Sequence, residues 1–533
     1  MQQVIHKQFV RLAWTGVLLI GLVGAVHAAD EQFRVNAYEI SGNHLVSDAE
    51  LAQLLVPFTG PNRVFGDIQK ALEAIEGRYR QLGYAGIQVG LPEQALDSGK
   101  VRMTIIESSL SRIKLTGNTH FTNQNILASL PTLQVGAPVN IRVLSESIQL
   151  TNENPAKTVD LVLGVGNQPG ELEARLEVQD EKPWRVYMTA DNTGNASTGH
   201  DRVGVAVQHA NLFDADHVAT AAYTTSLERP DRTSIYSLSY RLPLYRWGDS
   251  LDFILGYSDV SAGSAHTVAG PLQFSGTGEV FGLRYNHILA RQGHYSHRLI
   301  FAVDQRNYDN TCTLGGAAVC GAGGADISVR PLGVSYSGQW SPPGQATQFA
   351  LGIFANLPGQ AKGEQADFTA ARLDATARYQ LLKGSFAHSR NLPGHWQARI
   401  ALSGQYTRDA LVAGEQFSLA GSNAVRGFAE RAVAVDHGLL ATTELYTPEL
   451  PLSFLSGSLR ALAFADYGLG AFNKTPPGLH GSAHIASIGL GLRYTMAKQT
   501  SLRFDLARVV SGGPAGSAQA GDWSGHAGLT YGF

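Results

Sequence analysis

The chain is poor in charge, in cysteine and in long apolar runs. Only 16% of its 533 residues are charged, and its 41 Lys and Arg do not outnumber its 44 Asp and Glu. A nucleic-acid-binding protein needs a basic surface, so this balance gives no support for nucleic acid as a partner. Beyond Ala28 no run approaches the roughly 20 apolar residues that a transmembrane helix needs. If the mature chain enters a membrane, it therefore does so as strands.

The sequence also lacks the motifs of common enzyme classes. It has no Gly-x-x-x-x-Gly-Lys-Ser/Thr loop, no nucleophile elbow and no His-Glu-x-x-His. Scattered histidines, including His200, His209 and His217, have no ligand partners at suitable spacing. We expect no catalytic residue, no metal and no cofactor, and we expect that the protein is not an enzyme.

Residues 1–28 read as a signal peptide. Lys7 and Arg11 precede an apolar run from Leu12 to Val26, and a small-residue cleavage signature ends at Ala28. A membrane-spanning helix is the competing interpretation, but a span needs a longer run than this one. The mature protein is therefore expected to be exported.

Only two cysteines are present, which excludes a disulfide-dense scaffold. Cys312 and Cys320 lie in a Gly/Ala-rich stretch, where an oxidising compartment would let them close a small loop. Their spacing, without neighbouring ligands, is poor for zinc, and a redox pair would more often read Cys-x-x-Cys. We regard the two as a disulfide candidate.

An internal repeat organises the first third of the chain. Ile40–Leu51 reads ISGNHLVSDAEL and recurs 75 positions later as LTGNTHFTNQNI in Leu115–Ile126. Each copy reads as a strand, a Gly-Asn turn and a capped helix, with Ser47 and Glu50 placed as a capping box. Apolar residues at helical spacing, ended by a glycine, then predict a second helix in the first copy. These residues are Ile68, Leu72, Ile75, Tyr79, Leu82 and Gly83.

Alternating strands close each copy and give two tandem β-α-α-β-β modules, residues 30–108 and 109–182. The modules resemble polypeptide-transport-associated (POTRA) domains, and the Gly-Asn repeat carries that resemblance. Small sheets of this kind have open edges to which an extended polypeptide can add a strand through main-chain hydrogen bonds. The alternative is that the modules are spacers or folding aids.

From residue 183 to the C-terminus the chain reads as a series of strands with one apolar face. A soluble sandwich would bury such a face, whereas a membrane barrel turns it toward lipid. The C-terminus favours the barrel, because apolar residues ending in Phe533 share one face. They are Trp523, Ala527, Leu529, Tyr531 and Phe533. This ending resembles the insertion signal of outer-membrane barrels, which implies recognition by the outer-membrane assembly machinery.

Sixteen strands are expected, an even number as in bacterial single-chain barrels. They are placed near residues 184, 201, 217, 232, 248, 276, 295, 326, 344, 366, 395, 436, 459, 485, 500 and 523. Long connections at 260–276, 310–326 and 411–436 are expected outside the cell, and 241–249 reads as a tighter turn. The fold class is thus mostly β, a 16-stranded transmembrane β-barrel preceded by two periplasmic α+β POTRA domains.

Together with a Gly/Asn-rich turn at Asp191–Arg202, these features resemble the two-partner secretion transporter family of ShlB/FhaC/HecB-type haemolysin secretion and activation proteins. The resemblance covers essentially the whole mature chain. It implies an outer-membrane transporter that binds one large exoprotein, of haemolysin or adhesin type, in the periplasm and exports it through the barrel. The alternatives are an insertase of the same superfamily and a passive porin or receptor. Few residues separate Ala28 from Phe33, so no pore-plugging helix is expected there.

The same resemblance implies a site. In that family a Val-Arg-Gly-Phe/Tyr loop folds back into the lumen, and its arginine pairs with an aspartate on an inward-facing strand. Here the loop spans about 411–435 and its motif is Val425, Arg426, Gly427 and Phe428. The strand motif matches at Asp466, and Glu444 is a weaker match on the preceding strand.

The residues themselves permit this pairing. Extended chain from Leu411 to Arg426 reaches roughly 45 to 50 Å, more than the roughly 25 Å apolar band of a barrel. Alternation places Asp466 on the face of Phe464 and Gly468, as a lumenal carboxylate requires. The alternative is a solvated Arg426 and an Asp466 paired elsewhere.

Overall fold

The computed structural model describes residues 32–533 except 195–197, 260–262, 268–269, 275–277, 309–312, 315–316, 319–325, 451–456, 476–479 and 497–499. The predicted signal peptide, Cys312 and Cys320 lie outside the described residues. The chain divides into two compact units. One comprises the residues up to Arg78 with Gln88–Ile106, and the other comprises Tyr79–Ile87 with Glu107–Phe533. The second repeat and the barrel therefore belong to one unit.

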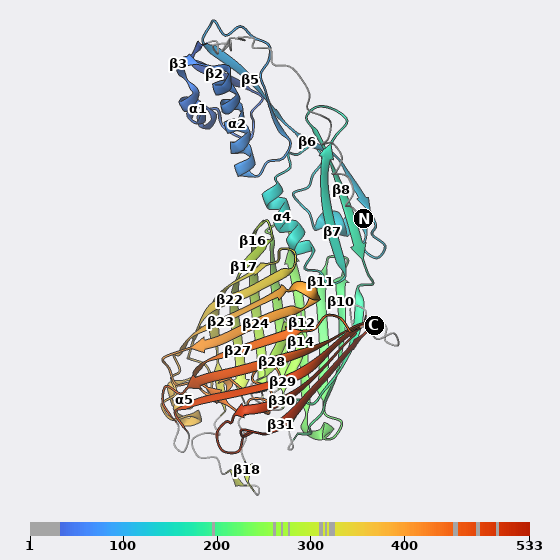
Figure 1. The fold of residues 1–533 in the computed structure, drawn as a ribbon, viewed down its shortest axis with the longest axis vertical. Coiled ribbons are helices and arrows are strands. Elements are labelled where there is room, and N and C mark those ends of the chain that lie inside the picture. The colour runs from blue at the N-terminus through green and yellow to red at the C-terminus, as the bar shows by residue number, and fades with distance from the viewer. Residues whose placement is uncertain are drawn as a thin grey trace, which may run out of the picture. The chain divides into compact units, whose positions relative to one another are not determined.

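The first unit is a small α/β module (Figure 1). Its sheet has the order β2-β5-β4, and β2 runs parallel to β5. Ser47 accepts a hydrogen bond from the amide of Glu50, but the Glu50 carboxylate binds Arg78, so only half of the expected capping box forms. The elements of this first module are β1 Phe33–Val35, β2 Ala37–Ser41, α1 Asp48–Leu55, η1 Val56–Phe58, β3 Gly60–Arg63, α2 Phe65–Leu82, β4 Ile87–Gly90 and β5 Lys100–Glu107.

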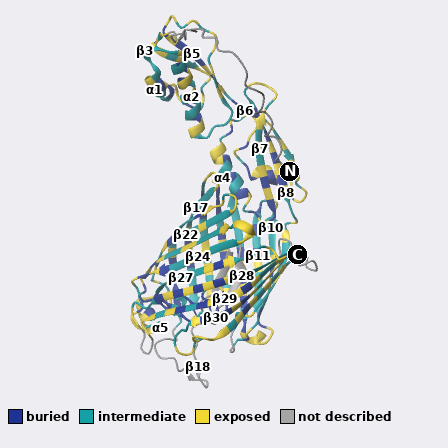
Figure 2. Ribbon diagram, viewed as in Figure 1, coloured by how far each residue is buried: buried dark blue, intermediate teal, exposed yellow. Residues whose placement is uncertain are grey.

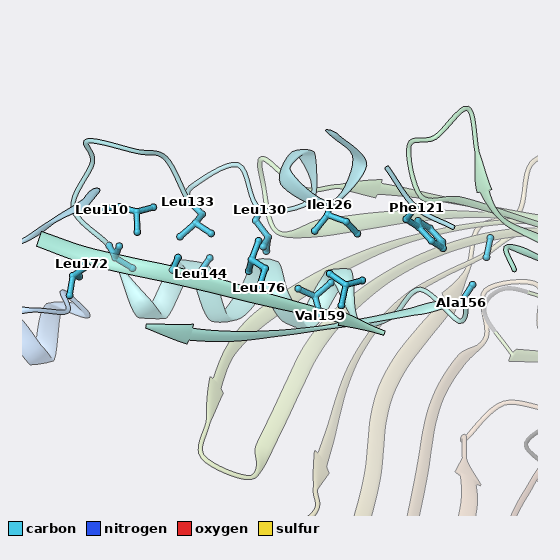
Figure 3. Packing of buried hydrophobic residues seen from close by; sticks show 14 of the residues in the cluster. Leu110, Phe121, Ile126, Leu130, Leu133, Leu144, Ala156, Val159, Leu172 and Leu176 are labelled. Atoms are coloured by element: carbon cyan, nitrogen blue, oxygen red, sulfur yellow. The ribbon is translucent and has the colours of Figure 1, made fainter. Parts of the chain in front are cut away.

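The second module has the same plan, with sheet order β6-β8-β7 and β6 parallel to β8. Two helices pack on that sheet and bury a leucine-rich core (Figure 3). Its elements are β6 Ser109–Thr116, α3 Asn123–Ala128, α4 Ile141–Thr151, β7 Lys157–Val165 and β8 Glu171–Asp180.

The Gly-Asn repeat has the same structural cause in both modules. Gly42 and Gly117 have φ of 85° and 92°, and a Cβ at either would lie 2.2 Å from a carbonyl oxygen of the parallel partner strand. Glycine is therefore required at both turns. Asn43 and Asn118 each donate to a main-chain carbonyl three residues ahead, which closes the turn before the helix.

Beyond the second module, the second unit is a closed barrel of sixteen strands. Two segments, β20 and β21, pair with the same strand β17 and count as one, and β31 pairs with β9 to close the ring. The strands are β9 Trp184–Asp191, β10 Arg202–Leu212, β11 His217–Thr225, β12 Ser234–Leu244, β13 Asp249–Ser258, β16 Gly278–Gln292, β17 Tyr295–Tyr308, β20 Ile327–Val329, β21 Pro331–Trp340, β22 Gln345–Asn356, β23 Gln380–Asn391, β24 Gln397–Tyr406, β27 His437–Tyr446, β28 Ser458–Ala471, β29 Ser482–Met496, β30 Thr500–Ser511 and β31 Trp523–Gly532.

Burial alternates along these strands (Figure 2). On β28, Tyr467 and Leu469 are exposed while Phe464 and Asp466 are buried. The exposed face is apolar and the buried face carries most of the charge, as expected when the first faces lipid and the second faces the lumen. Among the described residues no helix is both long enough and apolar enough to cross a membrane.

One expected strand was wrong. No strand begins near residue 366; α5 (Gln365–Ala371) lies there, and the tenth strand, β23, begins only at Gln380. Glu364 and Asp367 form a reciprocal capping box that starts this helix. Residues 357–379 are therefore a fourth long connection, in addition to the three that the sequence predicted.

Candidate lumenal site

The loop between β24 and β27 is folded rather than extended. Two short strands, β25 (Phe417–Ser418) and β26 (Ala434–Val435), pair with each other and fold the loop into a hairpin. Its apolar side chains, among them Val425, pack on inward-facing residues of β29 and β30. The loop therefore lies inside the barrel.

Two contacts hold the tip of the hairpin. Ser422 donates its amide hydrogen to Glu430, and Gly427 donates its own to Nε2 of His526 on β31, at 3.0 Å. Gly427 has φ of 97°, and a Cβ there would lie 3.2 Å from Val509 on β30. The motif glycine thus permits both the turn and the close approach to the barrel wall.

Arg426 is almost completely buried against the wall. Its Nε and Nη2 donate to the two carboxylate oxygens of Asp466 at 2.7 and 2.9 Å, and its amide donates to the same group. The guanidinium lies over the ring of Phe464, 3.4 Å from the centroid. A two-pronged pair of this kind fixes orientation as well as charge.

Two further carboxylates face the same guanidinium. Nη1 of Arg426 lies 3.0 Å from Glu444 on β27 and 3.4 Å from Asp505 on β30. Arg399 pairs with Glu444, while Arg493 and Arg503 pair with Asp505. The structure therefore places Arg426, Asp466 and Glu444 together, within a larger network of alternating charges.

The sequence reasoning missed Asp505, His526 and the three wall arginines. A signal for Asp505 was available, because it interrupts the alternating strand Thr500–Ser511 in the way that Asp466 interrupts β28. The contact of His526 with a main-chain amide leaves no pattern in the sequence.

A cavity of about 750 Å³ lies beside the loop tip. Arg426, Glu444 and Arg503 line it, and Gln149 of α4 contributes from the second module.

The Gly/Asn-rich turn at Asp191–Arg202 is described in part, since residues 195–197 lie outside the described residues. Arg202 in this turn is buried and donates to the carbonyls of Thr198 and Gly199.

Two periplasmic-type α/β modules and a closed barrel containing an inward-folded loop define the class of POTRA-plus-barrel outer-membrane transporters. Comparison with known proteins identifies the family. The profile of the haemolysin secretion/activation protein family ShlB/FhaC/HecB matches residues 170–494, and that of the ShlB-type POTRA domain matches residues 33–108. The chain belongs to the ShlB/FhaC/HecB family.

Known relatives match much of the chain at low identity, and one solved structure has the same fold. The heme/hemopexin transporter protein HuxB of Haemophilus influenzae is 24% identical over 493 residues, covering 89% of this chain and 83% of HuxB. The hemolysin transporter protein ShlB of Serratia marcescens is 24% identical over 390 residues, covering 70% and 64%. The structure of CdiB from Escherichia coli superposes with a TM-score of 0.77 at 18% identity, covering 96% of this chain and 93% of CdiB.

The protein is therefore an outer-membrane transporter of two-partner secretion. It works with a large exported partner protein, and its POTRA domains lie in the periplasm.

Proposed function

We propose that this transporter captures one large partner in the periplasm and threads it outward through a barrel whose lumenal loop is latched by Arg426 and Asp466. The observation that carries this proposal is the burial of Arg426 against three wall carboxylates. A charged side chain removed from water needs compensating charges. The loop is therefore held in one defined position, in which Arg426 meets these carboxylates. The haemolysin or adhesin nature of the partner stays an expectation.

The POTRA modules supply an entry surface for an extended chain. Within the described residues, β7 pairs only with β8 and leaves its other edge open. Strand addition at such an edge uses main-chain hydrogen bonds and tolerates varied side chains. We propose that the partner is recognised at these edges without catalysis, cofactor or metal.

The C-terminal residue Phe533 supports a proposal about assembly. Phe533 exchanges two main-chain hydrogen bonds with Val186 on β9, both of 3.0 Å, and its ring is exposed on the lipid-facing side. A residue that closes the barrel and remains outward is suited to be read before closure by the assembly machinery. We propose that role for Phe533, and a disulfide between Cys312 and Cys320 that peptide mapping without reductant would detect.

The test is deletion of the gene, followed by quantitative mass spectrometry of culture supernatant and outer membrane. We expect loss of one very large supernatant protein while the outer membrane is unchanged. Complementation with the wild-type gene should restore export, and Arg426→Ala should not restore it at equal surface abundance. A broad fall in barrel proteins would contradict the proposal in favour of an insertase, and no change in either fraction would favour a porin.

A further inference from the structure

The connection between β22 and β23, residues 357–379, is a folded element rather than a loose loop. Its α5 buries Phe368, and Tyr379 at its end is also fully buried. Both pack with Leu411 and Val412, which begin the lumenal loop. We call residues 357–379 the clasp.

The clasp lies at the extracellular end of the barrel. β9 leaves the POTRA end, and the strands after it alternate in direction, so the β22–β23 and β24–β27 connections lie at the opposite end. The clasp and the base of the lumenal loop are therefore neighbours on the cell surface side.

One side chain of the clasp contacts both ends of the lumenal loop. Arg372 donates to Asp436 at 2.5 and 3.0 Å, where the loop ends, and to the carbonyl of Leu411, where it begins. It also donates to the carbonyl of Lys474 and lies over the ring of Phe472 in the next connection.

Asp436 is the acceptor that gathers these contacts. It has no exposed surface and also accepts hydrogen bonds from the amides of Leu411 and Asn473, at 3.1 and 2.9 Å. A second carboxylate at the loop base, Glu415, binds Arg306 and Tyr308 of β17, each at 2.8 Å. The loop is thus fixed at its base as well as at its tip.

Phe368 of the clasp and Leu411 at the loop base are both fully buried in one apolar cluster, so the clasp and the loop base share a core. We propose that the clasp is a second latch, in which Arg372 is the positioning residue that holds the loop base and must release it for export. This inference rests on the proposed transport function.

A reversible lock tests the proposal. Ala375 of the clasp and Ala410 before the loop are partners in a parallel bridge, a spacing compatible with a disulfide. We would introduce Ala375→Cys and Ala410→Cys in a Cys312→Ser, Cys320→Ser background, which serves as the control. Oxidised cells should export at most about a tenth of the control level, since a covalent link removes the open state altogether, and a reductant should restore export.

The outcomes separate this inference from the transport function. If the wild-type protein does not export the partner, the proposed function fails. If the control exports and the oxidised variant, with its bond verified by mass spectrometry, exports equally well, the clasp proposal is overturned.

A conductance measurement decides the matter even where the cysteines do not bond. Arg372→Ala in planar bilayers should raise the open-to-closed ratio by about tenfold or more, because a buried charged acceptor loses its main donor. Arg372→Lys keeps the charge and should be intermediate. Arg378→Ala, an exposed arginine of the same clasp, is the matched control. Equal ratios for Arg372→Ala and Arg378→Ala would overturn the proposal.

Discussion

Replacing Arg426 with alanine should undock the lumenal loop while the barrel still assembles. The guanidinium makes two side-chain hydrogen bonds with Asp466 and lies within 3.4 Å of Glu444 and Asp505. Among the described residues, Asp466 has no other cationic partner within 4 Å, whereas Arg399 still serves Glu444 and Arg493 still serves Asp505. The substitution therefore leaves one buried carboxylate without compensation.

Breaking a buried pair in this way costs about 3 to 5 kcal/mol. Since each 1.4 kcal/mol is a factor of ten, the ratio of docked to undocked loop should fall by about a hundredfold or more. Export should drop at unchanged surface abundance, and planar bilayers should show more frequent open events. Arg460→Ala on β28 is a matched control, because that arginine bonds Gln397 and not the loop. Wild-type export and conductance for Arg426→Ala would refute the latch.

A simple exchange of the two charges is a poor test of direct pairing. It would place a carboxylate at position 426 beside Glu444 and Asp505, so repulsion would obscure any rescue. A cycle of Arg426→Ala, Asp466→Asn and the double variant avoids this problem. If the two residues act as a pair, the second substitution adds little to the first; full additivity of the two losses would mean that they act separately.

Three further predictions concern single sites. Gly427→Ala should weaken loop docking by about 1 to 2 kcal/mol through its positive φ and its wall contact, seen as easier proteolysis of the loop; Gly516→Ala, with φ of 88° and open space, controls for backbone strain alone. Burial raises the pKa of Asp180, but hydrogen bonds from three amides and a hydroxyl outweigh burial, so the pKa is lowered in the folded protein. Ionised Asp180 should therefore stabilise the folded POTRA region above about pH 4, and this stabilisation should be lost as the pH falls further. Asp180→Asn should remove this pH dependence from urea unfolding of the POTRA region. Lys157→Met should destabilise the junction of the second module and the barrel by about 3 to 5 kcal/mol in thermal unfolding. The reason is that Asp216 stays buried but loses its ion pair with Nζ of Lys157, which lies 2.5 Å from its carboxylate. An unchanged transition would contradict this.

Much of the fold was predictable because barrel strands carry a simple period. Residues that face lipid, such as Leu490 and Tyr531, must be apolar, whereas the residues between them face the lumen and can be polar. This alternation allowed fifteen of the sixteen strands to be placed near their positions. The tenth strand was misplaced because residues 365–371 form a helix, which begins at the capping box of Glu364 and Asp367.

The site was less accessible to sequence reasoning because it is built from contacts between residues that lie far apart in the sequence. The motif indicated Arg426 and Asp466, but Asp505 joins them only through the order β27-β28-β29-β30. The clasp was invisible for the same reason: Arg372 reads as one arginine in a polar stretch until the fold brings it to Asp436, 64 residues later. The inward folding of the loop and the packing of neighbouring connections, rather than local pattern, determine which inward charges meet.

The distribution of cations around the carboxylates explains which contact can act as a switch. Asp505 is held by Arg493 and Arg503 on the wall itself, so it remains compensated when the loop leaves. Within the described residues, the one ion-pair partner of Asp466 lies on the loop, and the one ion-pair partner of Asp436 lies on the clasp. A wall charge that pairs with a movable partner favours the closed state by the net energy of that pair, whereas a charge that pairs with other wall residues favours neither state. In the mechanism that we propose, the loop is therefore controlled at Asp466 and Asp436, while Asp505 keeps its wall partners in either state.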